Sequence, residues 1–459
     1  MEERRGRLRD DYFSEATQRM SANLKEERRK LKGLSGKQKE AQKELIESLK
    51  ADYEAARVDD IQQMCQRIQE GDYTIQLKTV NAKGKMGYTT ANVESMILSK
   101  VLMLELKRSY KYVPANRNDI IEELRALLDN PMPKVVIRAD IHHFFESIPQ
   151  DKLMGMIMED AFLSASSLKT LKTFLYEYNE LAGNQVERLG VPRGLPFSSY
   201  LAEIYMASFD YKVSRIEGVY YYKRYVDDII LIAKPVKKEI KDYWTSIETL
   251  VQEIGLTLNE EEEKRRCVLL SPELASPLPM NYLGYQFLYA NGCLEVLLTE
   301  RKFKHYKDTI RVIFENYQSI ASHTSRRRNP KVKKTDTTLQ FMHRLSALTG
   351  NGRLNGRKNY VLVGIYYSNK YITNLEQLRQ LDDYLKACVD NEIMFCPPKN
   401  MFQYGAGNDY DRCVTIIKDK IRSEYSFVKG FETRRLYRWS DYTNILRQNS
   451  ALYYSQEDE

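Results

Sequence analysis

Short apolar runs alternate with amphipathic stretches between residues 61 and 290. Crowded apolar and β-branched residues predict a buried strand at Lys134–Ile141 and two strands around a tight turn within Gly218–Ala233. A turn signal at residues 290–292 predicts a hairpin built from Asn281–Tyr289 and Cys293–Leu298. Helical periodicity predicts helices at Asp151–Glu180, Leu195–Val213 and Lys237–Ile254. This mixture of elements predicts an α+β core.

The segments that flank this core have a different pattern. Residues 1–60 are rich in Glu, Lys, Arg, Gln and Ala and contain no Pro, which predicts one or two solvated helices around a break at Gly33–Gly36. Such helices would clamp nucleic acid, bind a second subunit or simply cover the surface, so homo-oligomerisation stays open. Strand signals fade beyond residue 300, where helical periodicity recurs at Glu300–Ile320, Thr338–Leu348, Asn374–Val389 and Tyr410–Tyr425. We therefore expect three parts: 1–60, 61–290 and a helical 291–459.

Composition narrows the class of protein only slightly. The 459 residues carry a net charge of +8, from 71 basic and 63 acidic residues, which permits a nucleic-acid partner without requiring one. No stretch approaches the ~20 apolar residues of a membrane span, and the charged N-terminus lacks the apolar stretch of a secretory signal. We expect a cytoplasmic protein with no membrane partner. The six Cys residues form no Cys-x-x-Cys pair, and with only five His residues the sequence argues against zinc chemistry.

The clearest chemical signal is Tyr-Val-Asp-Asp at residues 225–228, which lies between two apolar stretches. Adjacent Asp residues often mark an ordinary turn, but here two apolar strands would carry Asp227 and Asp228 at the tip of a hairpin. Asp140 ends a second apolar run and would otherwise cap the turn that follows it. His142 and His143 come next, and on a continued strand they would point to opposite faces as surface or packing residues.

If the strand that ends at Asp140 lies beside the hairpin, three carboxylates converge. At ~4 Å and an effective dielectric constant of ~20, each pair of like charges costs roughly 4 kcal/mol. A cluster of this kind needs divalent cations, and oxygen ligands suit Mg²⁺. Two Mg²⁺ ions held ~3.5–4 Å apart suit in-line phosphoryl transfer. The three acids therefore predict a two-magnesium nucleotidyl-transfer site.

Five motifs in order resemble those of reverse transcriptases: residues 140–145, 190–194, 225–228, 255–259 and 282–285. The resemblance covers roughly residues 100–290 and implies a right-hand polymerase, with fingers and palm at 61–290 and a thumb-like domain at 291–459. Tyr-x-Asp-Asp also differs from the Gly-Asp-Asp usual in viral RNA polymerases. The implied activity is RNA-directed DNA synthesis from deoxynucleotides. The resemblance implies Asp140, Asp227 and Asp228 as metal ligands, joined by the Ile141 carbonyl.

The same resemblance implies further roles. Phe145 matches a steric gate against the ribose 2′-hydroxyl, although it would equally serve as core, and Lys264 matches a Lys that protonates pyrophosphate, although it would equally lie on a solvated face. The turn and helix start that hold the template base and the nucleotide match Gly190, Pro192, Arg193, Gly194 and Ser198. Nucleic-acid contacts are implied for Tyr225 and for a primer-grip hairpin at Leu283, Gly284 and Tyr285.

The chain departs from the family pattern at two places. Arg193 stands where many members have Gln, which puts contacts to the nucleotide sugar in doubt. Around residues 83–85 the usual basic grip on the nucleotide is poorly matched, which leaves Lys83, Lys85 and Arg117 as candidates for triphosphate binding or as solvated charges. A basic linker at residues 321–336, which would suit an RNA backbone, includes Arg326, Arg327 and Arg328.

Arg193, Arg224 and the stretches 348–351 and 364–369 resemble bacterial defence-associated, or abortive-infection, reverse transcriptases, which are related to retron and group II intron enzymes. This resemblance implies antiphage defence, with a structured noncoding RNA as template and scaffold and DNA as product. Asp382, Asp383 and Asp390 fall at spacings typical of a solvated helix face, so no nuclease site is expected in the C-terminal part.

Two other readings stay open. The first is untemplated or protein-primed DNA synthesis on the same palm, for which Tyr453 or Tyr454 would supply the priming hydroxyl. The second is a catalytically idle RNA-binding scaffold. The scaffold is disfavoured, because an idle palm has no reason to retain three mutually repelling carboxylates.

Overall fold

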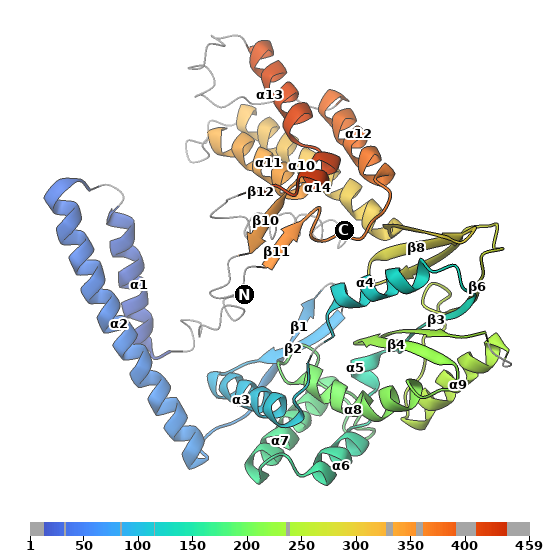
Figure 1. The fold of residues 1–459 in the computed structure, drawn as a ribbon. Coiled ribbons are helices and arrows are strands. Elements are labelled where there is room, and N and C mark those ends of the chain that lie inside the picture. Colours follow the sequence, from blue (N-terminus) through green and yellow to red (C-terminus); the bar gives the residue numbers. More distant parts are fainter. Residues whose placement is uncertain are drawn as a thin grey trace. The chain divides into compact units, whose positions relative to one another are not determined.

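The computed structural model describes residues 13–31, 34–82, 85–113, 115–235, 239–326, 334–354, 361–391 and 410–437. Figure 1 shows helices mixed with small sheets, and the expected α+β class is confirmed. The chain divides into two compact units. Unit 1 is drawn from residues 1–115, 140–229 and 242–259, and unit 2 from residues 116–139, 230–241 and 260–459.

Two long helices, α1 (Glu15–Lys30) and α2 (Gly36–Glu70), pack against each other at the start of unit 1. Met64 is the single buried residue of α2, all of whose residues are described, so the expected solvated character is confirmed. Met64 packs against Val93 and Met96 of α3 (Val93–Tyr110). The predicted boundary at residue 60 falls inside α2, because helical composition continues to the cap at Gly71.

The largest sheet among the described residues has four strands. Its strands are β3 (Lys134–Asp140), β4 (Val219–Tyr225), β5 (Asp228–Ala233) and β6 (Arg266–Leu270), in the order β4-β5-β3-β6. The central strands are the most buried, since every residue of β3 and all of β5 except Asp228 lie in the interior. Continuous apolar runs are typical of strands covered on both faces. The predicted strands at Lys134–Ile141 and Gly218–Ala233 are therefore confirmed.

The rest of the core consists of one hairpin and six helices among the described residues. A hairpin of β1 (Leu77–Ala82) and β2 (Lys85–Thr90) is antiparallel. The stretch Asp151–Glu180 divides into two helices, because Ala161 has φ of 52° and Ser164 caps the second one. The helices are α4 (Arg117–Leu128), α5 (Phe144–Ser147), α6 (Gln150–Asp160), α7 (Ala165–Ala182), α8 (Ser198–Val213) and α9 (Ile240–Glu253).

A three-stranded antiparallel sheet in unit 2 corrects one prediction. It contains β7 (Leu278–Tyr282), β8 (Tyr285–Ala290) and β9 (Cys293–Leu298). The stretch Asn281–Tyr289 is not one strand, because Leu283 and Gly284 have φ of 43° and 78° and turn the chain between β7 and β8. The predicted turn at residues 290–292 does join β8 to β9.

The C-terminal part of unit 2 contains α10 (Glu300–Arg326), α11 (Lys334–Thr349), α12 (Glu376–Asn391), α13 (Tyr410–Glu424) and α14 (Phe427–Thr433). The expected helical character is confirmed, but strands are not absent, because β10 (Asn351–Leu354), β11 (Val361–Gly364) and β12 (Leu436–Tyr437) form a small sheet. The predicted linker at 321–336 overlaps two helices, since α10 continues to Arg326 and α11 begins at Lys334. No helix among the described residues combines the length and apolar character that crossing a membrane requires.

Asp382 of α12 was wrongly placed on a solvated face. Its carboxylate is buried and accepts hydrogen bonds from the backbone N–H groups of Phe427 (2.5 Å) and Val428 (3.3 Å) and from the Ser426 hydroxyl (2.6 Å). Burial raises the pKa of Asp382 above its usual value, although these hydrogen bonds oppose the shift. Asp382 therefore caps the start of α14, which is a structural role.

Candidate active site

Three carboxylates converge in unit 1. Asp140 ends β3, Asp227 lies in the turn between β4 and β5, and Asp228 begins β5. Because β3 and β5 are neighbours in the sheet, these positions share one edge. One carboxylate oxygen from each residue lies within 4.8 Å of the others. Asp140 is buried, while Asp227 and Asp228 are half-buried.

Backbone hydrogen bonds fix the position of Asp140. The Ile141 N–H donates to the Asp227 carbonyl at 3.1 Å, which joins the end of β3 to the acidic turn. Asn259 donates its backbone N–H to the Asp140 carbonyl at 2.7 Å and its side-chain amide to Asp140 Oδ1 at 3.2 Å. The stretch at residues 255–259 therefore orients the first carboxylate, a role that sequence reasoning had not assigned to Asn259.

The donor set suits hard divalent cations. Three carboxylate oxygens at these separations can share a metal ion, and oxygen ligands are those that Mg²⁺ prefers. Among the described residues, this is the single group of three or more His, Cys, Asp or Glu side chains with metal-binding spacing.

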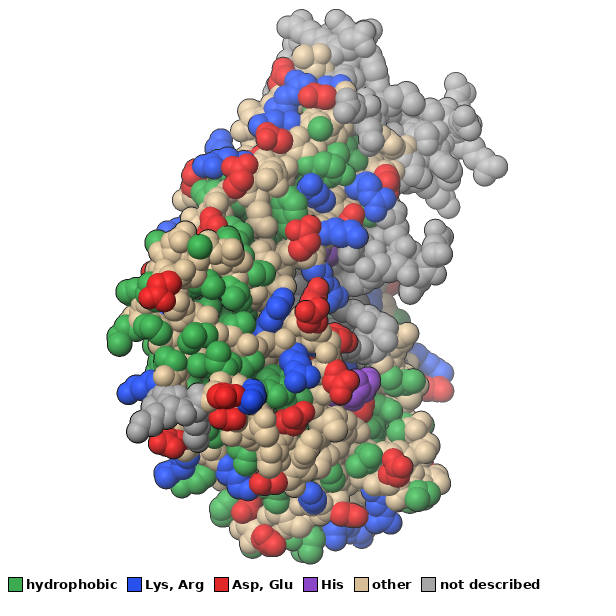
Figure 2. Space-filling model, turned by 90° about the vertical axis from the view of Figure 1, so that its right-hand side faces the viewer, with side chains coloured by type: hydrophobic (Ala, Val, Ile, Leu, Met, Phe, Trp, Pro, Cys, Tyr) green, Lys and Arg blue, Asp and Glu red, His purple; other side chains and the backbone are tan. Residues whose placement is uncertain are grey.

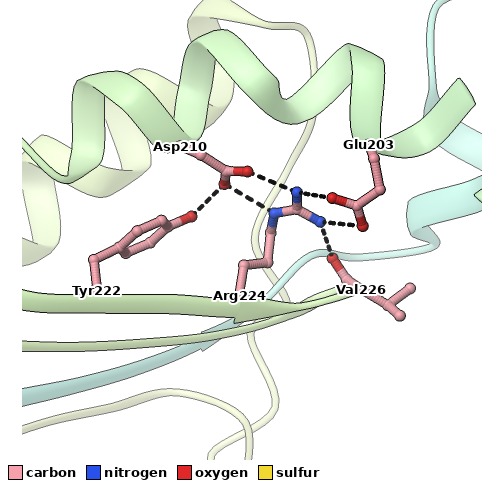
Figure 3. Close-up of polar contacts among 5 residues, drawn as sticks. All are labelled: Glu203, Asp210, Tyr222, Arg224 and Val226. Carbon is pink, nitrogen blue, oxygen red and sulfur yellow. Dashed lines mark hydrogen bonds and ion pairs between the residues drawn. The ribbon is translucent and has the colours of Figure 1, made fainter. Parts of the chain in front are cut away.

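The turn that carries Asp227 and Asp228 rests on a buried ion network, drawn in Figure 3. Arg224 of β4 donates to Glu203 (3.1 and 2.5 Å), to Asp210 (2.9 and 2.7 Å) and to the Val226 carbonyl (2.8 Å). Tyr222 donates its hydroxyl to Asp210 at 2.5 Å. Burial alone would lower the pKa of Arg224, but the two carboxylates outweigh it and raise that pKa. Burial also raises the pKa of Tyr222.

Phe145 lies in α5, five positions after Asp140, and is half-buried. The Arg193 guanidinium lies 5.4 Å from the centre of the Phe145 ring and 3.2 Å from the Glu146 carboxylate. The Val191 N–H also donates to the Phe145 carbonyl at 2.7 Å. The turn at 190–194 therefore packs directly against the residue expected to be the steric gate.

Two glycines in this turn have no room for a side chain. Gly190 has φ of 87°, and a Cβ there would lie 2.5 Å from the Tyr178 hydroxyl. Gly194 has φ of 105°, and a Cβ would lie 2.7 Å from the Tyr88 carbonyl. Ser198 starts α8 and donates its hydroxyl to the Pro192 carbonyl at 2.7 Å. The expected turn and helix start are thus present.

We expected His142 and His143 to lie on opposite faces of a continued strand. The strand does not continue, because β3 ends at Asp140. Both are exposed, and His143 adopts φ of 44°. Their rings meet edge to face, with 4.1 Å between the centroids. The surface position that we expected for them is confirmed.

The turn at Leu283–Gly284 lies in unit 2 and is contacted by Arg117. Arg117 of α4 donates to the Leu283 carbonyl, through Nε at 3.0 Å and also through Nη2, and lies 5.2 Å from the centre of the Tyr285 ring. Lys302 of α10 approaches the same ring at 5.3 Å and donates to the Ser368 carbonyl at 3.0 Å. Arg117, a candidate for triphosphate binding, is therefore engaged with this turn.

We expect Lys302→Met to stabilise the protein most at low pH. Burial, and then the charge of Arg117, lowers the pKa of Lys302 to about 7, against 10.5 as its ordinary value. Between these values the unfolded chain binds more protons than the folded chain. The free-energy cost of burying Lys302 is therefore full below pH 7 and falls as pH rises towards 10.5.

Urea unfolding of Lys302→Met and wild type at pH 6 and pH 10 measures this effect. The gain in unfolding free energy should be larger at pH 6. Lys304→Met, at an exposed position of the same helix, is the control and should give no such difference. An equal gain at both pH values would show that Lys302 keeps its ordinary ionisation in the folded state.

Two further residues with expected contacts are described by the structure, and several others lie outside the described residues. Lys264 lies in a turn rather than a helix, with its ammonium 3.8 Å from Glu261 and about a third of its side chain exposed. Tyr225 ends β4 and is half-buried. The predictions that lie outside the description concern Lys83, Arg327, Arg328, Tyr453 and Tyr454, and the side chains of Lys85 and Arg326.

On the face drawn in Figure 2, the described residues form no region made up mainly of basic side chains. Lys and Arg side chains of the described residues are interspersed there with Asp and Glu side chains. The Lys and Arg side chains of the described residues therefore form no single patch on that face.

Glu203 and Asp210 were missed as parts of the site. They are seven residues, or two helical turns, apart on the largely apolar helix α8. This spacing places both acids on the same face of the helix. That spacing was the available signal, but it does not identify Arg224 as the partner.

Comparisons of sequence find similarity to reverse transcriptases. Residues 78–287 match the family described as reverse transcriptase (RNA-dependent DNA polymerase). A curated relative, the retron Ec86 reverse transcriptase of Escherichia coli, is 27% identical over 155 residues, which are 32% of this chain and 43% of the relative. The chain thus spans less than half the length of that relative.

Solved structures of telomerase are more distant. Apo telomerase from Candida tropicalis is 13% identical, with 83% of this chain and 65% of that chain covered and a TM-score of 0.37. Telomerase from Candida albicans with a fragment of telomeric RNA is 12% identical, with 82% and 64% covered and a TM-score of 0.34. TM-scores this low carry no assignment of fold or function.

Proposed function

We propose that this chain, whose residues 78–287 match the reverse transcriptase family, is an RNA-directed DNA polymerase that copies RNA into DNA at Asp140, Asp227 and Asp228. The observation that supports this most strongly is the convergence of these three carboxylates within 4.8 Å, at the two motifs where the family has its metal ligands. The family match alone would leave open whether the acids meet.

In this proposal Asp140, Asp227 and Asp228 hold two Mg²⁺ ions, with the Ile141 carbonyl as a further ligand. Bound there, the ions would activate the primer 3′-hydroxyl and neutralise charge on the triphosphate and the departing pyrophosphate. Asn259 keeps the Asp140 carboxylate oriented through its 3.2 Å hydrogen bond. The protein's own contribution is to hold these oxygens in place before the nucleotide arrives.

The neighbouring residues would select and orient the nucleotide. Phe145 would bar a ribose 2′-hydroxyl, while the turn with Gly190, Pro192, Arg193 and Gly194 and the start of α8 at Ser198 would bind the base pair and sugar. Lys264 is proposed to protonate pyrophosphate. Nucleic-acid contacts are proposed for Tyr225, Leu283, Gly284, Tyr285, Arg326, Arg327 and Arg328.

We further propose a structured noncoding RNA as template and antiphage defence as the role. The support is the resemblance at residues 348–351 and 364–369 together with the retron relative. Within the fold these stretches also have a structural task, since the buried Asn351 donates to the Gly430 carbonyl at 2.8 Å and Asn369 to the Tyr306 hydroxyl at 3.0 Å.

Incorporation of labelled dNTPs by the purified chain with its co-purifying RNA tests the activity. We expect Mg²⁺-dependent synthesis that EDTA stops, and a product whose sequence is complementary to the RNA. A homopolymer or a sequence unrelated to the RNA would instead favour untemplated addition. Nucleotide covalently attached to a Tyr would indicate protein priming. No incorporation with any primed RNA template would favour the idle scaffold.

Arg193→Gln is expected to weaken discrimination against ribonucleotides by about two- to fivefold. The change removes both the ion pair with Glu146, worth about 0.2–1 kcal/mol at a partly exposed site, and the contact over the Phe145 ring, worth about 0.5–1 kcal/mol, and only part of this free energy acts on the position of the ring. The ratio of kcat/KM for a dNTP to that for the matching NTP measures the effect. Glu146→Gln, which breaks only the ion pair, should give a smaller change. An unchanged ratio in both variants would mean that Arg193 does not support the gate.

A further inference from the structure

The ion network beside the acidic turn uses every donor that Arg224 possesses. All five N–H groups of its guanidinium have an acceptor: two oxygens of Glu203, two of Asp210 and the Val226 carbonyl. Its side chain is only 3% exposed. Such a buried network contributes little net stability compared with apolar residues of similar volume. Its consequence is therefore better sought in geometry than in folding free energy.

The Val226 carbonyl, which accepts a hydrogen bond from Arg224, belongs to a strained stretch of backbone. Val226 has φ of 61°, a left-handed conformation that a β-branched residue rarely adopts. Such a conformation persists only where the surroundings enforce it. Two hydrogen bonds do so here, one from Arg224 to the Val226 carbonyl at 2.8 Å and one from the Ile141 N–H to the Asp227 carbonyl at 3.1 Å.

The carboxylates that orient Arg224 come from a rigid element. Glu203 and Asp210 lie two turns apart on α8, and their side chains point to the guanidinium from the same side, as Figure 3 shows. A bidentate pair with each acid leaves the guanidinium no freedom to rotate. The remaining N–H is thereby aimed at the Val226 carbonyl.

We propose that Arg224 is a positioning residue whose guanidinium, held by Glu203 and Asp210, fixes the left-handed turn at Val226 and so sets the two turn carboxylates for divalent metal binding. The proposal rests on the proposed function, since the bound metal ions would serve DNA synthesis. It does not require that polymerisation be observed, because metal binding can be measured by itself.

Mn²⁺ binding to the full chain, followed by electron paramagnetic resonance, tests the proposal. Asp227→Asn identifies the part of the binding that belongs to the carboxylate cluster. Arg224→Lys keeps the charge but cannot supply five N–H groups, and we expect its Mn²⁺ dissociation constant to rise about 10- to 100-fold, as is typical when a partner behind the metal ligands is lost. In the polymerase assay, kcat should fall and the Mg²⁺ midpoint should rise, with KM for dNTP unchanged.

Two further variants separate positioning from general destabilisation. Lys212→Met breaks an exposed ion pair between α8 and Glu253 that does not reach Arg224, so Mn²⁺ affinity should stay at the wild-type value. Val226→Gly added to Arg224→Lys should recover part of the affinity, because Gly adopts positive φ without steric cost. Mere loss of folded protein would not be rescued by this second change.

Wild-type Mn²⁺ affinity in folded Arg224→Lys would overturn the proposal. If Arg224→Lys does not fold, as judged by circular dichroism and thermal unfolding, Glu203→Gln takes its place, with a smaller weakening expected and unchanged affinity again decisive against the role. Weakened binding in a chain whose wild type makes no DNA would support the positioning role, while the proposed function alone would fail.

Discussion

Asp227→Asn is expected to lower RNA-templated DNA synthesis by about 1,000-fold, which corresponds to about 4 kcal/mol in the activation free energy. Asp227 is one of three acids whose carboxylate oxygens lie within 4.8 Å. Asn keeps the size of the side chain but removes the negative charge that attracts a divalent ion. The same loss should follow from Asp140→Asn and Asp228→Asn.

In the metal-free protein, Asp227→Asn should be favourable, because it should increase thermal stability. At 4.8 Å and an effective dielectric constant of about 20, each like-charge pair costs about 3 kcal/mol before other partners are counted. Asp227→Asn should therefore raise the unfolding temperature in EDTA. Mg²⁺ stabilises the wild type by binding only the folded state, and this stabilisation should be reduced in the variant.

Single-nucleotide incorporation at saturating dNTP and thermal unfolding with and without Mg²⁺ measure the two effects. Asp151→Asn is the matched control, since Asp151 is an exposed acid at the start of α6 outside the cluster. It should leave both measurements at wild-type values. Asp227→Asn with wild-type turnover would mean that the metal assignment is wrong.

The strands that carry the acids were predictable because Asp140 ends one strongly apolar run and Asp228 begins another. Val135, Val136 and Ile137 are fully buried, as are the residues of β5 that follow Asp228. Such runs identify central strands from local sequence alone. That the strands are neighbours is not encoded locally, and it came instead from the family resemblance.

The parts that sequence reasoning missed depend on contacts between distant residues. Arg224 reaches Glu203 across 21 positions, and Asp382 reaches Phe427 across 45. A charge on a helical period looks solvated unless its distant partner is known. The small sheet of β10, β11 and β12 was missed for a related reason, since strands of two to four residues are too short for a period-2 pattern.

The split of Asn281–Tyr289 shows a different limit. Tyr282, Leu283 and Tyr285 read as strand residues, yet Leu283 adopts φ of 43°. Arg117 accounts for part of this conformation, because it donates to the Leu283 carbonyl from α4, 166 positions earlier in the chain. A local apolar pattern therefore predicted the strands but not the turn that separates them.

Phe145→Ala is expected to lower discrimination against ribonucleotides by about 100-fold, a typical limit for selection by the shape of a pocket. Phe145 is half-buried, lies five positions after Asp140 and is backed by Arg193 at 5.4 Å. Removal of the ring opens the space that a ribose 2′-hydroxyl would occupy. The kcat/KM for NTPs should therefore rise, while that for dNTPs falls only slightly.

The kcat/KM values for dNTP and NTP on one primed RNA template measure this selectivity. Phe145→Tyr is the control, because it keeps the ring in place and should retain discrimination. If Phe145 is only a core residue, Phe145→Ala would destabilise the fold and lower both kcat/KM values in proportion, so that their ratio stays constant. A changed ratio at matched folded fraction therefore distinguishes a gate from a packing residue.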